Sequence, residues 1–171
     1  MLNKNISKMI NDQVNKEFFS SYLYLQFSCY FASKNLNGFA NWYNVQAQEE
    51  KDHAMIFLNY MINNGEEVEL LALEKPENVY ADLEAPLLAG FKHEQFITAS
   101  INDIYAEALS LKDYRTVQFL DWFVKEQGEE EKNADELIQN YRLFGKDGKG
   151  LFMLDRELAA RTYTATTIDM I

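Results

Sequence analysis

The sequence contains a single cysteine, Cys29, with two prolines and seven glycines in 171 residues. One cysteine excludes a disulfide framework within the chain and a zinc site built on several thiolates. We interpret Cys29 as a small apolar side chain of the core. The scarcity of proline and glycine favours long, uninterrupted helices. Basic residues are also few, 16 against 27 acidic ones, and the resulting net charge of −11 argues against a nucleic-acid partner.

Long apolar runs are missing as well. No stretch approaches the roughly 20 apolar residues of a membrane-spanning helix, and the first residues, MLNKNISKMINDQ, lack the apolar centre of a signal peptide. We therefore expect a soluble, cytoplasmic protein with no membrane partner. The chain does have 47% hydrophobic residues, as folded globular proteins do. Its length predicts one domain, 1–171, with a sizeable core.

Apolar residues recur at helical spacing along nearly the whole chain, and no sustained alternation indicates a strand. This spacing predicts four long helices and a short fifth one, over about 5–33, 39–63, 83–111, 114–144 and 151–161. We expect Gly65 to cap the second helix and the glycine-rich GKDGKG to separate the fourth from the fifth. Because antiparallel helices need only a few linking residues, the long link after Gly65 predicts a crossover along a four-helix bundle.

Polar side chains fall on the apolar stripes of all four long helices, at one level of the bundle. At about 100° per residue, the inward positions are Glu17, Glu50, His53, Glu94, Gln127 and Glu130. One inward glutamate is usually a satisfied core group, but an unpaired buried carboxylate costs several kcal/mol. No lysine or arginine lies on these stripes at the same level. Metal is the most economical counter-charge for four such helices.

The spacing of these residues repeats along the chain. Glu50 follows Glu17 by 33 positions, Gln127 follows Glu94 by 33, and Glu94 follows Glu17 by 77. The chain is thus a pseudo-repeat of two helical hairpins, each with one single glutamate and one pair of ligands three residues apart. Two such hairpins bring their carboxylates together in the bundle centre, as in ferritin-like di-iron proteins. Oxygen ligands with one imidazole suit Fe(II), Mn(II) or Zn(II).

Over nearly its whole length the sequence resembles the ferritins, specifically the bacterial non-haem ferritins. The resemblance rests on QEEKDH in the second helix, EQGEEEK in the fourth and GLFMLDREL in the fifth. It implies an all-α ferritin-like bundle and a ferroxidase centre for two irons. By matching motif, Glu17, Glu50 and His53 hold the first iron. Glu50, as the bridge, holds the second iron together with Glu94 and Glu130.

The resemblance implies roles for further residues. A third iron position on the inner side is formed by Glu49, Glu126 and Glu129, with Glu130 shared. Gln127 is a weaker or indirect ligand because an amide is a poor replacement for a carboxylate. The family has a tyrosine at the position of Tyr24. This side chain hydrogen-bonds a ligand, donates an electron or is a core tyrosine, and the sequence leaves the three open.

Two departures from related families bear on the cofactor. Lys51 stands where haem-binding bacterioferritins have a methionine, and Glu130 stands where they have a histidine. We therefore expect iron and no haem. The single cysteine also excludes the Cys-rich iron domain of rubrerythrins.

The resemblance implies iron storage. Fe(II) is oxidised by O₂ or H₂O₂ at the di-iron centre and stored as ferric oxyhydroxide inside a hollow homo-oligomer, a 24-mer cage with the fifth helix near its four-fold axes. The acidic surface would attract Fe(II). One alternative is a non-storage di-metal oxidase or oxygenase for an organic substrate, and another is a metal-free bundle. The sequence predicts no structure for the tail from Thr162 and no role for Gly128.

Overall fold

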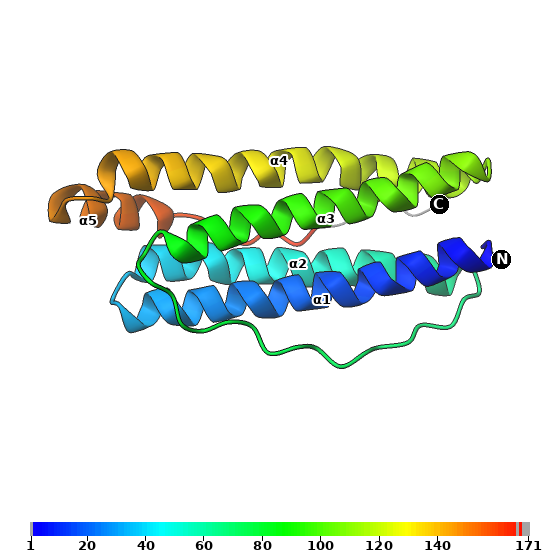
Figure 1. Ribbon diagram of the computed structural model, residues 1–171, viewed down its shortest axis with the longest axis horizontal. Helices are drawn as coiled ribbons and strands as arrows, with labels where there is room; N and C mark the ends of the chain where they lie inside the picture. The colour runs from blue at the N-terminus through cyan, green and yellow to red at the C-terminus, as the bar shows by residue number, and fades with distance from the viewer. Residues whose placement is uncertain (1, 167, 169–171) are drawn as a thin grey trace.

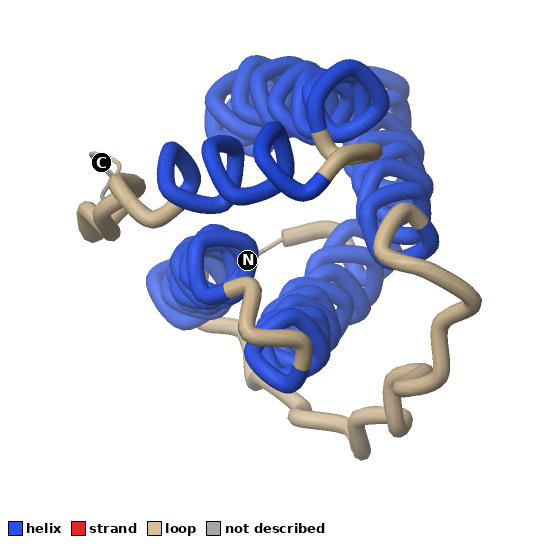
Figure 2. The backbone as a smooth tube through the Cα atoms, turned by 90° about the vertical axis from the view of Figure 1, so that its left-hand side faces the viewer, coloured by secondary structure: helices blue, strands red, loops and turns tan. Residues whose placement is uncertain are grey.

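The computed structural model describes residues 2–166 and 168, and over these residues it has five helices and no strand. They are α1 (Lys4–Ser33), α2 (Asn37–Asn63), α3 (Ala85–Ser110), α4 (Tyr114–Phe144) and α5 (Gly148–Leu158). The chain between α2 and α3 runs along the length of the bundle, and α5 follows α4 at one end (Figure 1). Seen along the bundle, α5 lies between α4 and α2, which it contacts (Figure 2). The predicted all-α bundle with a long crossover is confirmed.

Local hydrogen bonds set the helix ends. Gly65 has a φ of +75°, and the following amide, Glu66 N–H, donates to Met61 C=O, so the expected glycine cap ends α2. The helix α5 begins three residues earlier than predicted, because the Asp147 side chain accepts hydrogen bonds from Lys149 and Gly150 N–H. The predicted glycine-rich break is therefore shorter than expected, and two of its glycines are helical.

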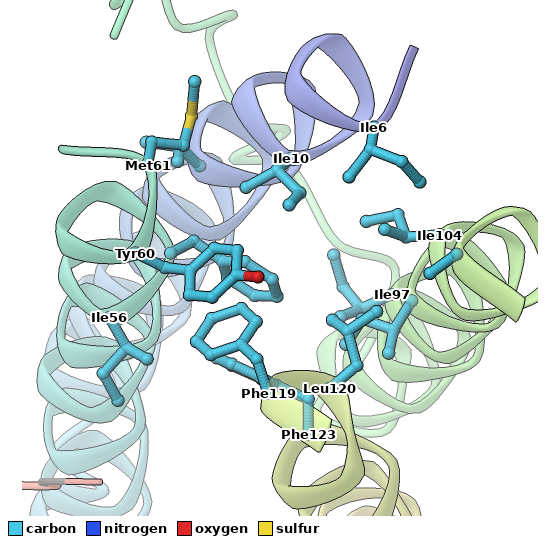
Figure 3. Close-up of a cluster of buried hydrophobic side chains, with 14 residues drawn as sticks. Ile6, Ile10, Ile56, Tyr60, Met61, Ile97, Ile104, Phe119, Leu120 and Phe123 are labelled. Atoms are coloured by element: carbon cyan, nitrogen blue, oxygen red, sulfur yellow. The ribbon is translucent and has the colours of Figure 1, made fainter. Parts of the chain in front are cut away.

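The apolar core forms two clusters, one toward each end of the bundle. The first contains Ile10, Phe57 and Phe123, packed with further isoleucines and aromatic rings (Figure 3). The second contains Tyr24 and Leu137. In every long helix, the residues of one cluster are separated from those of the other by the level at which the inward carboxylates lie. A polar layer therefore divides the core.

The segment after α5 runs back along α2. The Asn41 side chain donates to the C=O of Arg161 at 2.9 Å. Farther along α2, Asp52 Oδ2 accepts from the Tyr163 hydroxyl at 2.6 Å and from Thr166 N–H at 2.9 Å. The tail, which has no predicted structure, is thus held against α2 as far as Thr166.

Cys29 and Gly128 both lie on exposed faces of their helices. Cys29 is exposed, so its interpretation as a core side chain is wrong; it lies on the outer face of α1, five residues after the buried Tyr24. Gly128 is also exposed, and a Cβ built on it would meet no atom within 4 Å. Within the described residues, no helix is both long enough and apolar enough to cross a membrane.

Candidate metal centre

The inward carboxylates meet in the polar layer between the two apolar clusters. Two groups of three side chains each bring one ligand atom per residue within 4.8 Å of the others. The first group is Glu17, Glu50 and His53, and the second is Glu50, Glu94 and Glu130. All five side chains are buried. Because Glu50 belongs to both groups, the arrangement offers two adjacent metal positions that share one carboxylate.

Two buried glutamines that the sequence analysis missed hold the carboxylates in place. Gln13 Nε2 donates to Glu17 Oε1 at 2.7 Å. Gln46 Nε2 donates to Glu50 Oε1 at 2.9 Å and to Glu130 Oε2 at 2.8 Å. Each glutamine precedes its carboxylate by four residues on the same helix face. Gln13 and Gln46 are also 33 positions apart, as Glu17 and Glu50 are. This repeated spacing is the feature of the sequence from which they could have been predicted.

A chain of hydrogen bonds reaches this layer from the surface. Ser100 Oγ donates to Gln13 Oε1 at 2.6 Å, and Lys16 Nζ donates to Ser100 Oγ at 2.5 Å. The amide of Gln13 is thereby oriented with its Nε2 toward Glu17. The lysine lies beside the stripe of α1, next to Glu17 in the sequence, and it touches the site only through this chain.

Tyr24 and Gln127 both hydrogen-bond Glu94. The Tyr24 hydroxyl donates to Glu94 Oε1, and Gln127 Nε2 donates to Glu94 Oε2 at 3.1 Å. Of the three roles left open for Tyr24, this geometry supports a hydrogen bond to a candidate ligand. Gln127 thus contacts the candidate ligand Glu94 as a hydrogen-bond donor, and its indirect role at the metal stays a prediction. The aromatic side chain of Trp122 packs edge-on against the His53 ring, with 5.6 Å between ring centroids.

Burial and mutual repulsion set the protonation of this layer. Burial, followed by the charge of Glu50, raises the pKa of Glu17 to about 8 and that of Glu130 to about 8. The same two causes raise the pKa of Glu94 well above its usual range. Glu50 is different: burial pushes its pKa upward, but the charge and hydrogen bond of His53 outweigh this and lower it. Burial disfavours the His53 cation, yet Glu50 and the other carboxylates raise its pKa to about 10.

The layer therefore needs positive charge. Without a metal ion, protons on the carboxylates and the His53–Glu50 pair supply it. Two buried atoms in the described residues also lack a hydrogen-bond partner, Glu17 Oε2 and His53 Nε2. Buried polar atoms are normally satisfied, and both of these belong to the first group. A metal ion bound there would give both of them a partner, so the donor set fits a divalent cation.

The metal-free protein is expected to lose stability as the pH rises from about 4.5 to about 10. Folded Glu17 and Glu130, with pKa values of about 8 against 4.5, keep protons that the unfolded chain releases above pH 4.5. Folded His53, with a pKa of about 10 against 6.5, binds its proton more tightly than the unfolded chain does. Each group lowers the free energy of unfolding by up to about 1.4 kcal/mol per pH unit within its window. Calorimetry in EDTA measures this, and Glu17→Gln should flatten the profile; a melting temperature that rises over this range would contradict it.

The three residues of the expected third position are placed differently from one another. Glu126 has a ligand atom within 4.8 Å of one on His53 and one on Glu130. Glu129 is 60% exposed and faces Lys125 at 3.7 Å. Glu49 is ion-paired with Arg161. Among the described residues, neither Glu49 nor Glu129 belongs to a group of three ligand atoms this close, and the third position stays a prediction.

The chain is similar to known proteins over most of its length. The model of the ferritin-like domain family matches residues 7–144. The chain belongs to the ferritin family. A probable bacterial non-heme ferritin-like protein of Haemophilus influenzae is 37% identical over 158 residues, which is 92% of this chain and 96% of that protein. The bacterial non-heme ferritin of Campylobacter jejuni is 36% identical over 156 residues, 91% of this chain and 93% of its own.

Solved structures of the family have the same fold. A closed form of Archaeoglobus fulgidus ferritin, engineered by mutagenesis, superposes with a TM-score of 0.93 at 37% identity, over 96% of this chain and all of the other. A structure described as a novel open-pore ferritin from the same archaeon gives a TM-score of 0.92 at 37% identity, over 95% of this chain. The ferritin resemblance predicted from the helix motifs is confirmed.

Proposed function

We propose that this chain is the subunit of an iron-storage ferritin that oxidises Fe(II) at the buried layer and stores the product as ferric mineral. The observation that carries this is the pair of buried ligand groups sharing Glu50. Glu17 and His53 complete the first group and Glu94 and Glu130 the second. Iron storage accords with membership of the ferritin family and with the non-heme ferritin names of the relatives.

In the proposed reaction, two Fe(II) ions bind as substrates, one in each group. Each gives up one electron, and O₂ or H₂O₂ accepts the pair. The four carboxylates and one imidazole favour the higher charge of Fe(III), because oxygen ligands are hard donors. The buried glutamines and Tyr24 hold the carboxylates at fixed positions, so little reorganisation is needed when the charge increases. Oxidised iron then leaves the layer. We place Glu126 on its route out, because a Glu126 ligand atom lies within 4.8 Å of one on His53 and one on Glu130.

Storage requires a closed assembly, and we propose a homo-oligomer of the 24-mer cage type. Large apolar side chains are exposed in this single chain, and contiguous patches of them mark contact surfaces. On α5, Phe152 is 60% and Met153 is 62% exposed; on the crossover, Leu70 is 63% and Val79 is 85% exposed. These two regions are the proposed subunit contacts. The proposed chemistry is that of iron without haem, since Lys51 stands where haem-binding bacterioferritins have a methionine.

Aerobic loading with Fe(II) tests the proposal. Size-exclusion chromatography should give a particle of 24 × 20.0 kDa = 480 kDa, and electron microscopy after loading should show shells filled with dense mineral. A matched sample loaded with Zn(II) should show empty shells. A monomer or dimer that oxidises Fe(II) but forms no filled particle would instead favour the non-storage di-metal oxidase, for which the same ligand groups would serve.

A further inference from the structure

The guanidinium of Arg161 lies against Glu49, one of the ligands expected at the third cation position. Its Nη2 forms an ion pair with Glu49 Oε2 and donates to Gln46 Oε1 at 3.0 Å. Its Nη1 donates to Trp42 C=O at 3.3 Å, and its Cζ lies 4.2 Å from the centroid of the Trp42 ring. The side chains of Arg161 and Glu49 are only 18% and 20% exposed. Four contacts of different kinds therefore fix one half-buried cation on this carboxylate.

The backbone around Arg161 is fixed as well. The Asp155 side chain on α5 accepts from Gly38 and Phe39 N–H at the start of α2, and a Cβ on Gly38 would lie 1.6 Å from Asp155 C=O, so only glycine allows this approach. Beyond Arg161, Tyr163 and Thr166 hold Asp52. The arginine is thus carried by a segment anchored on both sides of it along α2, the red trace that runs back from α5 in Figure 1.

The charges around Glu49 explain why a cation belongs there. Burial raises the pKa of Glu49, and the carboxylates of Glu50 and Glu126 raise it further, while Arg161 opposes them. Arginine stays protonated at any physiological pH, and its planar fork matches a carboxylate. The guanidinium therefore gives Glu49 the permanent positive partner that a metal ion would otherwise supply.

We propose that Arg161 is a built-in cation at the third position, which limits this chain to two metal ions at the centre and keeps Glu49 from acting as a metal ligand while the segment lies on α2. This deepens the proposed function and rests on it. Removing the guanidinium would free Glu49 beside Glu126, whose carboxylate already lies within 4.8 Å of His53 and Glu130 ligand atoms.

Titration calorimetry with Zn(II), which is not oxidised, tests this on the whole assembled protein. The wild type should bind two ions per chain, and Arg161→Gln should bind three. Anomalous diffraction from zinc-soaked crystals should place the extra ion at Glu49. The dissociation constant for a third zinc ion should be at least about 10-fold larger in the wild type than in Arg161→Gln. Arg161→Lys keeps a positive charge and should keep the count at two.

Two controls separate the effect of the Arg161 charge from the attachment of the segment after α5 to α2. Tyr163→Phe removes the hydrogen bond to Asp52 but leaves Arg161 in place, so it should still bind two ions. Adding Glu49→Gln to Arg161→Gln should return the count from three to two. Three zinc ions in the wild type with one at Glu49, or an unchanged count in Arg161→Gln, would overturn the inference. If the wild type bound no zinc at the two buried groups, the proposed function would fail, and zinc at Glu49 in Arg161→Gln would still decide the role of Arg161.

Discussion

Glu50→Ala is expected to slow the rapid phase of Fe(II) oxidation by at least about 100-fold, since loss of an outer hydrogen-bond partner alone costs 10- to 100-fold at metal sites. Glu50 is the one carboxylate in both ligand groups, so its loss weakens both positions together. It is also the hydrogen-bond partner of His53 Nδ1 at 3.3 Å. Stopped-flow absorbance of ferric species after mixing with Fe(II) and O₂ measures the effect.

The matched control is Glu136→Ala. Glu136 is 59% exposed on α4 and faces Lys132 at 3.6 Å. The substitution therefore removes a carboxylate that does not contact the polar layer. Its oxidation rate should equal that of the wild type. Glu50→Gln, which keeps the shape of the side chain, guards against a folding defect and should be slow as well. Wild-type rates in both Glu50 variants, with native circular dichroism, would show that the oxidation site lies elsewhere.

Zn(II) is expected to raise the melting temperature of the metal-free protein by about 10–20 °C. Binding to the folded state alone contributes about 2.7 kcal/mol per site at a free concentration 100 times the dissociation constant. Two sites give about 5 kcal/mol, and each kcal/mol is about 2–4 °C for a domain of this size. The ion also replaces protons and the His53 charge as the counter-charge of the buried carboxylates.

Calorimetry at one fixed protein concentration measures this shift, since assembly also depends on concentration. Glu50→Ala should lose most of the zinc effect, and Glu136→Ala should keep it. An equal shift in all three proteins would mean that zinc acts on exposed carboxylates. No shift in the wild type would exclude a metal site in the layer.

The sequence predicts the bundle and the position of its polar layer well, because both follow from periodicity. Glutamates that repeat at equal spacing on the apolar stripes of several helices indicate a shared metal site in the centre of the bundle. Helix ends depend on single side chains and are less predictable. Asp147 starts α5 early, and Asp82 Oδ1 accepts from Glu84 and Ala85 N–H, which delays the start of α3.

The contacts that tune the site could not be predicted for a different reason. Gln13 and Gln46 read as ordinary polar residues, and only their spacing relative to the glutamates marks them. The sequence places Arg161 at the end of the predicted fifth helix, but α5 ends at Leu158. The place of Arg161 on Glu49 depends on how α5 docks against α2. No local pattern encodes such a contact between positions 112 residues apart.

We propose that the buried layer binds two irons that share Glu50. Anomalous diffraction at the iron edge, from crystals soaked with Fe(II) without oxygen, can locate both ions. We expect two peaks per chain, one bonded to Glu17, His53 and Glu50 and the other to Glu94, Glu130 and Glu50. A single peak, or iron bound only outside these two groups, would contradict it.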